Sequence, residues 1–331
     1  MFFRQPIGRA VLLAFLAAST LRCAATVRPT VADVPSSSLS DLWKPVDVAA
    51  SDLFNGPWGA GRAPDAHAEY TFVRPKTGGG VNPGMVVRDP SGRKWHIKQA
   101  PRNNLRRGDE GPVEVVLSRV LSAVGYHQPP VYYLPSFTLR DASGRHIEPG
   151  GRFRLDEPSL SDHGEWSWQQ NPFVGQKSYQ GLLAILMMFN SSDLKNSNNT
   201  IYEFKDHGRS ERWYVVRDLG NALGRTGGLS PSRNNLGLFE RTRYITGVGD
   251  GFVEFDYHAL HGELVRKRIT PDDAAWASAL MGRLSPRQWQ DAFRAGGYDA
   301  ATAARYIDIL RGRVAEGARV AGPSSGTRVT R

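Results

Sequence analysis

The stretch FNSSDLKNSNNTIYEF, residues 189–204, decides how this sequence is interpreted. It begins where the apolar run GLLAILMMF ends, and its residues 190–199 contain one acid, one lysine and four asparagines. Asparagine competes with backbone hydrogen bonds, so it favours turns and helix caps over helix and strand interiors. The pattern therefore predicts a polar loop that is held rigid by a buried helix, as a functional site requires.

The length and charge of the chain limit its class. Its 331 residues suffice for one large two-lobed domain or two small domains. A content of 40% hydrophobic and 22% charged residues is typical of a globular protein and excludes disorder throughout. The net charge of +10 favours acidic partners. No long basic run is interleaved with aromatic residues, so we expect no specific nucleic-acid partner.

The N-terminus is typical of an export signal. Arg4 and Arg9 precede the short apolar run VLLAFLAAS, and Cys23-Ala24-Ala25 resembles a small-residue cleavage site. We therefore expect residues 1–25 to direct export, which would make the protein periplasmic, secreted or surface-attached. A buried N-terminal helix is the alternative interpretation.

Cys23 is the only cysteine, so no disulfide can form within the chain. Lipid anchoring at Cys23 is an alternative to cleavage, although Leu21 and Arg22 fit that processing poorly. No second apolar run of about 18 residues follows, so we expect no permanent membrane span.

Composition and periodicity divide the rest of the chain. Residues 26–65 are rich in Ser, Pro, Ala and Asp, which indicates a partly disordered tether. Residues 66–155 are predicted to form a first lobe, an antiparallel sheet carrying one helix. Its expected strands are YTFVRP, GMVVRD, RKWHIKQ, PPVYYLPSF and FRL, and its expected helix is GPVEVVLSRVLSAVG.

Residues 156–320 are predicted to form a second, mainly helical lobe. The buried helix SYQGLLAILMMF is followed by the polar loop and by a hairpin, in which TIYEF and RWYVVRDLG flank the turn KDHGRSE. After residues 224–237 we expect helices only, with Pro or Asp start signals, and residues 321–331 a frayed tail. The predicted fold class is thus α+β, with two lobes.

Residues able to carry chemistry occur in both lobes. Lys98 lies on the second strand of a predicted hairpin, where a buried lysine needs a partner. Glu114, in the first turn of the following helix, is the expected partner, and Glu110 is the alternative. Lys98 could instead face solvent, because Lys94, His96 and Lys98 alternate along the strand.

The polar loop contains the pattern D-x-K-x-x-N, formed by Asp193, Lys195 and Asn198. The predicted hairpin follows it, and the second strand of that hairpin ends in Asp218-Leu219-Gly220. A plain strand-ending turn is the alternative interpretation of these three residues. In the first lobe, Gly78, Gly79 and Gly80 lie between strands, where backbone N–H groups could cover phosphates, although such clusters are often ordinary loops.

In this order of parts, the chain resembles the protein-kinase-like superfamily over roughly residues 70 to 225. The resemblance is to its atypical branches, which are lipid-kinase-like, toxin-kinase-like or secretory-pathway-kinase-like. It implies a two-lobed fold with ATP in the cleft, Mg²⁺ as metal and phosphoryl transfer to a hydroxyl. It also implies that Asp193 orients the hydroxyl, that Lys195 neutralises phosphoryl charge, and that Asn198 and Asp218 bind metal.

The resemblance further implies that Lys98 and Glu114 position the phosphates, beneath the glycines at 78–80. Two features depart from the signalling kinases: Ser191-Ser192 replace His-Arg before the acid, and no A-P-E follows Gly220. The acceptor therefore stays open, whether protein, lipid head group or small molecule. The alternatives are a catalytically silent kinase-like nucleotide-binding module and a basic surface protein that binds anionic polymers.

Overall fold

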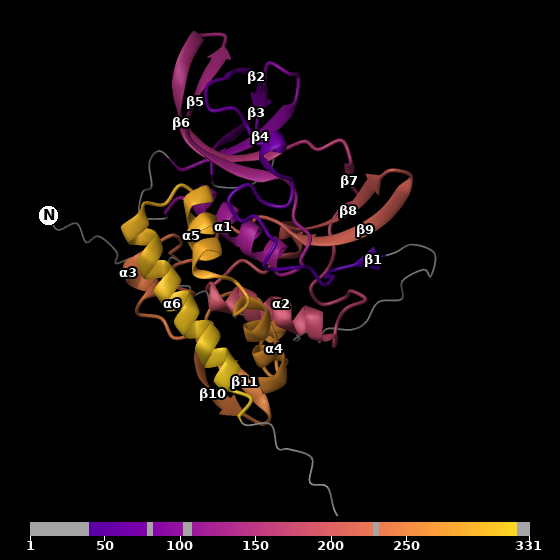
Figure 1. The fold of residues 1–331 in the computed structure, drawn as a ribbon, viewed down its shortest axis with the longest axis vertical. Coiled ribbons are helices and arrows are strands. Elements are labelled where there is room, and N and C mark those ends of the chain that lie inside the picture. Colours follow the sequence, from indigo (N-terminus) through magenta and orange to yellow (C-terminus); the bar gives the residue numbers. More distant parts are fainter. Residues whose placement is uncertain (1–39, 78–81, 102–107, 228–231, 323–331) are drawn as a thin grey trace, which may run out of the picture.

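Alternating apolar residues build a closed barrel in the first half of the chain. The computed structural model describes residues 40–77, 82–101, 108–227 and 232–322. The barrel strands are β2 (Glu69–Pro75), β3 (Gly84–Arg88), β4 (Lys94–Gln99), β5 (Val131–Asp141) and β6 (Gly144–Leu155). They pair in the order β2-β3-β4-β6-β5, and β2 pairs with β5 to close the barrel. Figure 1 shows the barrel at the top of the molecule.

The closure corrects one detail of the prediction, which was an antiparallel sheet. Along the barrel order β2-β3-β4-β6-β5, each strand runs antiparallel to the next. The closing pair, β2 and β5, is parallel. Five strands of alternating direction begin and end with the same direction, so their closing pair has to be parallel. The barrel interior is filled by apolar side chains, including Tyr70, Trp95, Ile97, Phe137 and Phe153.

Helix α1 (Glu110–Ala123) lies between the barrel and the second half of the chain (Figure 1). Asp109 caps it by accepting a hydrogen bond of 2.9 Å from the Gly111 N–H. The apolar residues of α1, such as Val113, Val116 and Val120, belong to the larger core of the second lobe and not to the barrel interior. Their burial fixes α1 against the helical lobe, with its polar first turns left facing β4.

The larger core is built by the helices of the second lobe. These are α2 (Lys177–Met188), α3 (Leu236–Phe239), α4 (Pro271–Met281), α5 (Pro286–Ala295) and α6 (Ala300–Arg319). The predicted Pro and Asp start signals of the last three helices are present: Pro271 and Pro286 are the first residues of α4 and α5, and Asp299 accepts from the Thr302 N–H ahead of α6. The structure adds capping boxes at Thr270 and Ser285. None of the described helices has the length and apolar character that crossing a membrane requires.

A hairpin interrupts the segment for which only helices were expected. Strands β10 (Ile245–Gly249) and β11 (Phe252–Phe255) pair antiparallel around Asp250 and Gly251, both of which have positive φ. An Asp-Gly pair between short strands is a strong hairpin signal, because a type I′ turn needs positive φ at both central positions. The prediction of helices alone is therefore wrong here.

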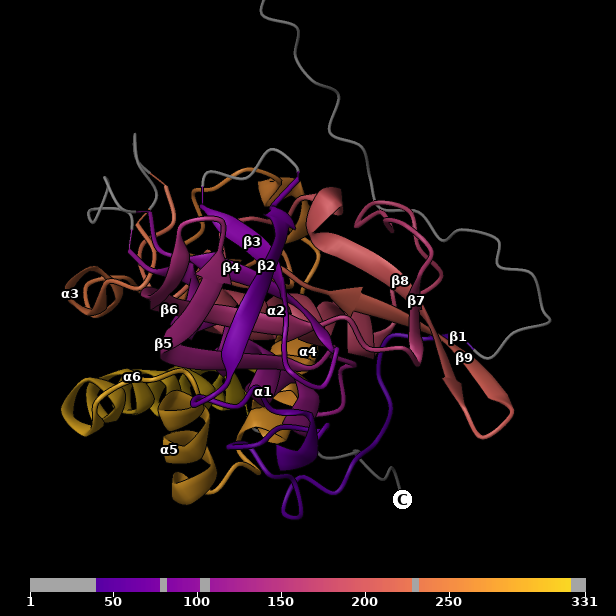
Figure 2. The same cartoon turned by 90° about the horizontal axis from the view of Figure 1, so that it is seen from above.

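A second sheet flanks the helical lobe. Its strands are β1 (Ser40–Asp41), β7 (Leu160–Asp162), β8 (Asn199–Asp206) and β9 (Arg209–Val216), in the order β1-β9-β8-β7. The predicted hairpin is thus present, with a turn confined to His207-Gly208. Within the segment predicted as a tether, Leu42, Val48 and Leu53 are buried in the larger core. Figure 2 shows this sheet on one side of the molecule and α5 and α6 on the other.

Candidate active site

The polar loop starts at the C-terminal end of α2, and its first residue ends that helix. Asn190 has a left-handed backbone (φ 52°), which asparagine tolerates better than most residues. The Asn190 N–H donates to Met187 O at 3.0 Å and the Ser191 N–H to Leu186 O at 2.9 Å. This is the Schellman pattern of helix termination, so the chain leaves α2 in a defined direction.

Arg313 of α6 holds this turn from below. Its Nη1 donates to Met188 O at 2.7 Å and to Asn190 Oδ1 at 2.9 Å. The Asn190 side-chain amide in turn donates to Gly224 O at 2.8 Å. Arg313 is buried, which lowers its pKa to about 10. The prediction of a polar loop mounted on a buried helix is confirmed.

Two asparagines of the loop, Asn196 and Asn199, use their side chains to hold neighbouring backbone. Asn196 Oδ1 accepts from the Trp168 N–H at 2.9 Å, and Asn199 Nδ2 donates to Trp166 O at 3.1 Å. These two amides therefore bond loop backbone, as expected. The two tryptophan side chains are buried and lie edge to face with ring centroids 4.7 Å apart, so they support the loop with a rigid wall.

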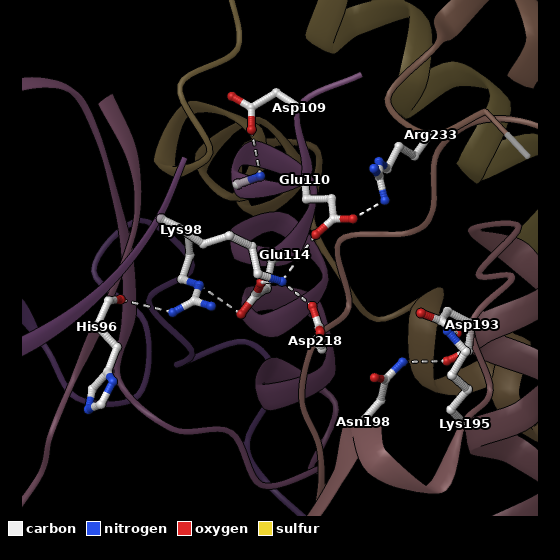
Figure 3. Close-up of polar contacts among 12 residues, drawn as sticks. His96, Lys98, Asp109, Glu110, Glu114, Asp193, Lys195, Asn198, Asp218 and Arg233 are labelled. Atoms are coloured by element: carbon white, nitrogen blue, oxygen red, sulfur yellow. Dashed lines mark hydrogen bonds and ion pairs between the residues drawn. The ribbon is translucent and has the colours of Figure 1, made fainter. Parts of the chain in front are cut away.

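Two backbone hydrogen bonds tie the loop to the segment that contains Asp218. The Arg217 N–H donates to Asn198 O at 2.9 Å, and the Ser192 N–H donates to Asn221 O at 3.0 Å. The hairpin places these residues together, because Asn199 at the start of β8 is paired with Val216 at the end of β9. Asp193 and Asp218 thus come from neighbouring, hydrogen-bonded segments, and Figure 3 shows Asn198 drawn between them.

The segment Asp218-Leu219-Gly220 has a distinct role for each residue. Asp218 has φ 61°, a backbone conformation that is uncommon outside glycine and is frequent at functional sites. Leu219 is buried in the larger core, which is the apolar role expected of it. At Gly220, a Cβ atom would lie 2.5 Å from Glu110 Cβ, so only glycine allows this close approach to α1.

Lys98 of β4 lies at the point where three elements meet (Figure 3). Its Nζ lies 3.1 Å from Glu110 Oε2 and 3.2 Å from Glu114 Oε2, and it also pairs with Asp218 Oδ1. The Lys98 side chain is only 5% exposed, whereas that of Asp218 is 45% exposed. A solvent-facing Lys98 is therefore excluded, and the opening of this charge cluster is on the Asp218 side.

Each of the two glutamates on α1 has a second cation. Arg152 Nε on β6 lies 2.9 Å from Glu114 Oε1, and Arg233 pairs with Glu110. Burial alone would raise the pKa of Glu114, but Arg152 and Lys98 outweigh it and hold the pKa below its usual value. Burial would likewise raise the pKa of Asp218, and Lys98 lowers it below the usual value. Both carboxyl groups are therefore ionised at neutral pH.

Further cations line the same face of the barrel. In the register of the sheet, Lys98 pairs with Arg152 and His96 pairs with Arg154. The side chain of Arg154 makes no hydrogen bond or ion pair with the described residues. Burial and nearby Arg154 lower the pKa of His96 to about 4, so this histidine is neutral. Sequence reasoning missed both arginines, although the alternation R-F-R at residues 152–154 was the available signal.

Asp193, Lys195 and Asn198 form a second contact group. Lys195 Nζ lies 2.8 Å from Asp193 Oδ1, and Asn198 Nδ2 donates to Asp193 O at 2.7 Å. The Asn198 side-chain oxygen accepts no hydrogen bond from the described residues and is left as a potential ligand. Asn198 is the last residue of η3 (Asn196–Asn198), a short 3₁₀ helix at the end of the loop.

The donor set fits a hard cation such as Mg²⁺ only as part of a larger site. Asn198 and Asp218 offer oxygen atoms, the ligands that Mg²⁺ prefers. Within the described residues, no group of three or more His, Cys, Asp or Glu side chains could hold a metal by itself. This agrees with the usual binding of Mg²⁺ by one or two protein ligands together with phosphates and water.

The structure thus brings most of the predicted residues into two adjacent groups. Lys98, Glu114 and Asp218 are in direct contact, and Asp193, Lys195 and Asn198 form the neighbouring group. Glu110, the alternative partner of Lys98, is paired as well and is the first residue of α1. Gly78, Gly79 and Gly80 lie outside the described residues. The chemical roles of all these residues stay predictions.

This chain matches known proteins in structure but not in sequence. The sequence matches no protein-family model and no curated protein. The fold is similar to that of the Helicobacter pylori proinflammatory kinase CtkA, with TM-score 0.43 and 9% identity over 76% of this chain and 96% of that one. It is also similar to the Golgi casein kinase with Mn/ADP bound, with TM-score 0.38 and 12% identity over 78% and 72% of the two chains.

The predicted fold class is confirmed. The order of elements in this chain is a barrel carrying Lys98, the helix α1, the loop after α2, the β8–β9 hairpin and Asp218. This is a two-lobed α+β fold, and its elements occur in the order that the sequence indicated.

Proposed function

We propose that this protein is an ATP- and Mg²⁺-dependent phosphotransferase that acts on a hydroxyl acceptor in an extracytoplasmic compartment. The observation that supports it best is the convergence of Lys98, Glu114 and Asp218 from three separate elements. Burying a lysine among carboxylates is unfavourable unless charges and geometry match closely. Such a cluster beside a loop with D-x-K-x-x-N is what the phosphoryl-transfer reaction needs.

The proposed roles follow from charge and exposure. Lys98, kept in place by Glu110 and Glu114, would pair with phosphate oxygens. Arg154, which has no partner among the described residues, would add positive charge for the phosphates from the adjacent strand. Glu114 would not contact substrate. It would position Lys98, since its second oxygen is already held by Arg152 at 2.9 Å.

The loop residues would act on the acceptor side. Asp193 would orient the attacking hydroxyl and accept its proton. Lys195, which pairs with Asp193 at 2.8 Å and is half exposed, would move to the transferring phosphoryl group. Asn198 and Asp218 would hold Mg²⁺, which when bound neutralises charge that develops on the phosphates.

The proposed function also includes a compartment and a class of acceptor. Export is inferred from the signal-like residues 1–25, which lie outside the described residues. The acceptor is a hydroxyl group of a protein, a lipid head group or a small molecule.

The direct test is transfer of labelled phosphate from ATP by the purified full-length protein, with Mg²⁺ and an extract as acceptor source. We expect Asp193→Asn to lower transfer by at least about a hundredfold, as for loss of a catalytic base. ATP binding, followed by calorimetry, should change little. Asp206→Asn is the matched control, because Asp206 is an exposed acid at the tip of the β8–β9 hairpin.

Two outcomes would contradict the proposal. Full transfer by Asp193→Asn would remove the assigned base. ATP binding without turnover by the wild-type protein, with any acceptor fraction, would instead support the catalytically silent nucleotide-binding module.

A further inference from the structure

A cavity lies beside the C-terminal part of α1, at the opposite end of this helix from the residues that contact Lys98. It has a volume of about 330 Å³ and is bounded by the segment 44–58, by α1 residues near its C-terminal end and by the β8–β9 hairpin. None of the residues assigned to phosphoryl transfer lines it. Small-molecule sites in proteins begin at about 300 Å³, so the cavity has room for a small organic ligand.

Arg119 of α1 lines this cavity without a partner for its charge. The residue is only 2% exposed, and its Nε forms no hydrogen bond. Within the described residues, the guanidinium makes no hydrogen bond and no ion pair. Burial therefore lowers the pKa of Arg119 to about 10. A buried cation in this state is unfavourable for the fold by itself, which suggests that it serves a ligand.

Asp52 is the acid that affects the charge of Arg119, and its carboxylate is already occupied by other hydrogen bonds. Asp52 also lines the cavity and influences Arg119 electrostatically, but it forms no ion pair with it. Its carboxylate accepts from the N–H groups of Phe54 and Asn55 at 2.9 and 3.0 Å and from Asn55 Nδ2 at 2.7 Å. Asp52 thus shapes the turn of the 44–58 segment.

The chain around Arg119 is built to accommodate the guanidinium. Gly56 has φ 75°, which favours glycine, and a Cβ atom there would lie 2.3 Å from Arg119 Nη1, so a larger residue would have to displace the guanidinium. On another side the guanidinium carbon lies 5.0 Å from the centre of the Tyr132 ring, within the range of a cation–π contact. The guanidinium is therefore contacted by Gly56 and by the Tyr132 ring, although it has no acidic partner among the described residues.

The remaining walls of the cavity are mainly apolar and aromatic. Trp58, Phe204 and Trp213 form one cluster, with the rings of Phe204 and Trp213 stacked at 4.1 Å. The two other basic side chains in the wall already have acidic partners: Lys44 pairs with Glu211 at 3.2 Å, and His127 pairs with Asp41. Within the described part of the chain, the cavity thus combines a buried cation that has no acidic partner with an apolar, aromatic wall.

We propose that this cavity binds a small organic anion, with a carboxylate or phosphate head on Arg119 and an apolar, aromatic body against Trp58 and Trp213. A carboxylate or phosphate matches the two parallel N–H groups of a guanidinium. The aromatic rings of the wall favour a flat apolar body. This inference does not depend on the proposed phosphotransferase activity.

The test is calorimetric titration of the full-length protein with benzoate and phenyl phosphate as probes. Benzamide serves as the neutral comparison, and inorganic phosphate as the anion without an apolar body. We expect one of the two organic anions to bind, and both comparison compounds to bind at least tenfold more weakly. Arg119→Met, which keeps the length of the side chain and removes its charge, should weaken that binding at least tenfold.

Three further variants make the result specific. Arg287→Met removes an exposed arginine on α5 and should bind the probe as the wild type does. Lys98→Met should also bind it unchanged, because Lys98 lies in the other charge cluster. If Arg119→Met fails to fold, Ser122→Phe fills the cavity while Arg119 is kept, and it should abolish binding.

The inference is overturned if neither organic anion binds the wild-type protein at millimolar concentration. It is also overturned if Lys98→Met loses binding while Arg119→Met or Ser122→Phe keeps it, because the anion would then bind at the Lys98 charge cluster. None of these readouts requires turnover of ATP, so failure of the phosphotransferase proposal would leave the result interpretable.

Discussion

Each end of α1 buries charge, but within the described part of the chain only the charge at the N-terminal end is paired with side chains of opposite charge. Glu114 faces the barrel and has two cations within 3.2 Å, whereas Arg119, five residues later, has no hydrogen bond and no acidic partner among the described residues. Both pKa values are lowered. For Glu114 the cations favour the charged form, and for Arg119 burial disfavours it. A buried charge with partners belongs to the protein's own structure, and one without them suggests a ligand.

The largest effect that would test this comparison is expected at Glu114. In Glu114→Gln, Lys98 and Arg152 stay buried and lose their shared carboxylate, which leaves buried charge uncompensated. We expect the free energy of unfolding to fall by about 3 kcal/mol, the lower end for a broken buried pair, because Lys98 keeps Glu110 and Asp218. Urea unfolding followed by tryptophan fluorescence measures it. Glu165→Gln, on an exposed acid, should change it by less than about 0.5 kcal/mol.

The second prediction concerns the other end of α1. Gly56 and Gly59 both have positive φ, but only at Gly56 would a Cβ meet the Arg119 guanidinium. Both substitutions to alanine therefore strain the backbone, and only Gly56→Ala also creates a clash. We expect Gly56→Ala to lower the free energy of unfolding by about 2 kcal/mol more than Gly59→Ala. Equal losses from urea unfolding would mean that Arg119 moves freely and is not held in place.

The third prediction uses pH at the cleft end. The pKa of His96 is about 4 in the folded protein against 6.5 ordinarily. The unfolded chain takes up a proton below pH 6.5 and the folded one does not, so His96 stabilises the fold fully above pH 6.5 and this contribution is lost as pH falls toward 4. Because His96 is partly exposed, we expect the free energy of unfolding to fall by about 1–2 kcal/mol between pH 6.5 and 4.

The matched variants for this pH effect are His96→Phe and His207→Gln. His96→Phe should show a smaller fall in stability between pH 6.5 and 4 in urea unfolding. His207→Gln, which alters a side chain that is 93% exposed, should follow the wild-type curve. If the two variants had the same pH profile, burial and the nearby Arg154 would not disfavour protonation of His96 as inferred.

The smallest effect is expected for Arg119→Met without ligand. Removing an unpaired buried charge relieves its desolvation but also removes the Tyr132 contact, so we expect the free energy of unfolding to stay within about 1 kcal/mol of wild type. A loss comparable to that of Glu114→Gln would show that Arg119 supports the fold, and the contrast between the two ends of α1 would disappear.

Much of the fold and the site could be predicted because their signals are local. The apolar run predicts the helix of residues 177–188, and the asparagine content predicts the loop after it. The β8–β9 hairpin and the capped helices α4 to α6 follow from strand patterns and start signals. The candidate residues Lys98, Asp193, Asn198 and Asp218 could be predicted because each belongs to a short pattern in a known order.

Other features could not be predicted, because they depend on residues distant in sequence. The pairing of Arg233 with Glu110 joins residues 123 positions apart, and no local pattern records it. The cavity at Arg119 depends on Gly56 and on the packing of Trp58 and Trp213 from two further segments. By contrast, the β10–β11 hairpin did carry a local signal, Asp250-Gly251, which was overlooked.

By itself, the sequence determined which elements form and which side chains carry charge, because periodicity, caps and turn residues act over a few neighbouring positions. Only the tertiary structure decided how those charges are matched. Closure of the barrel and burial of α1 bring Lys98 to three carboxylates and leave Arg119 facing a cavity. The physical reason is that the energy of a buried charge depends on the groups around it in space, and those groups come from all parts of the chain.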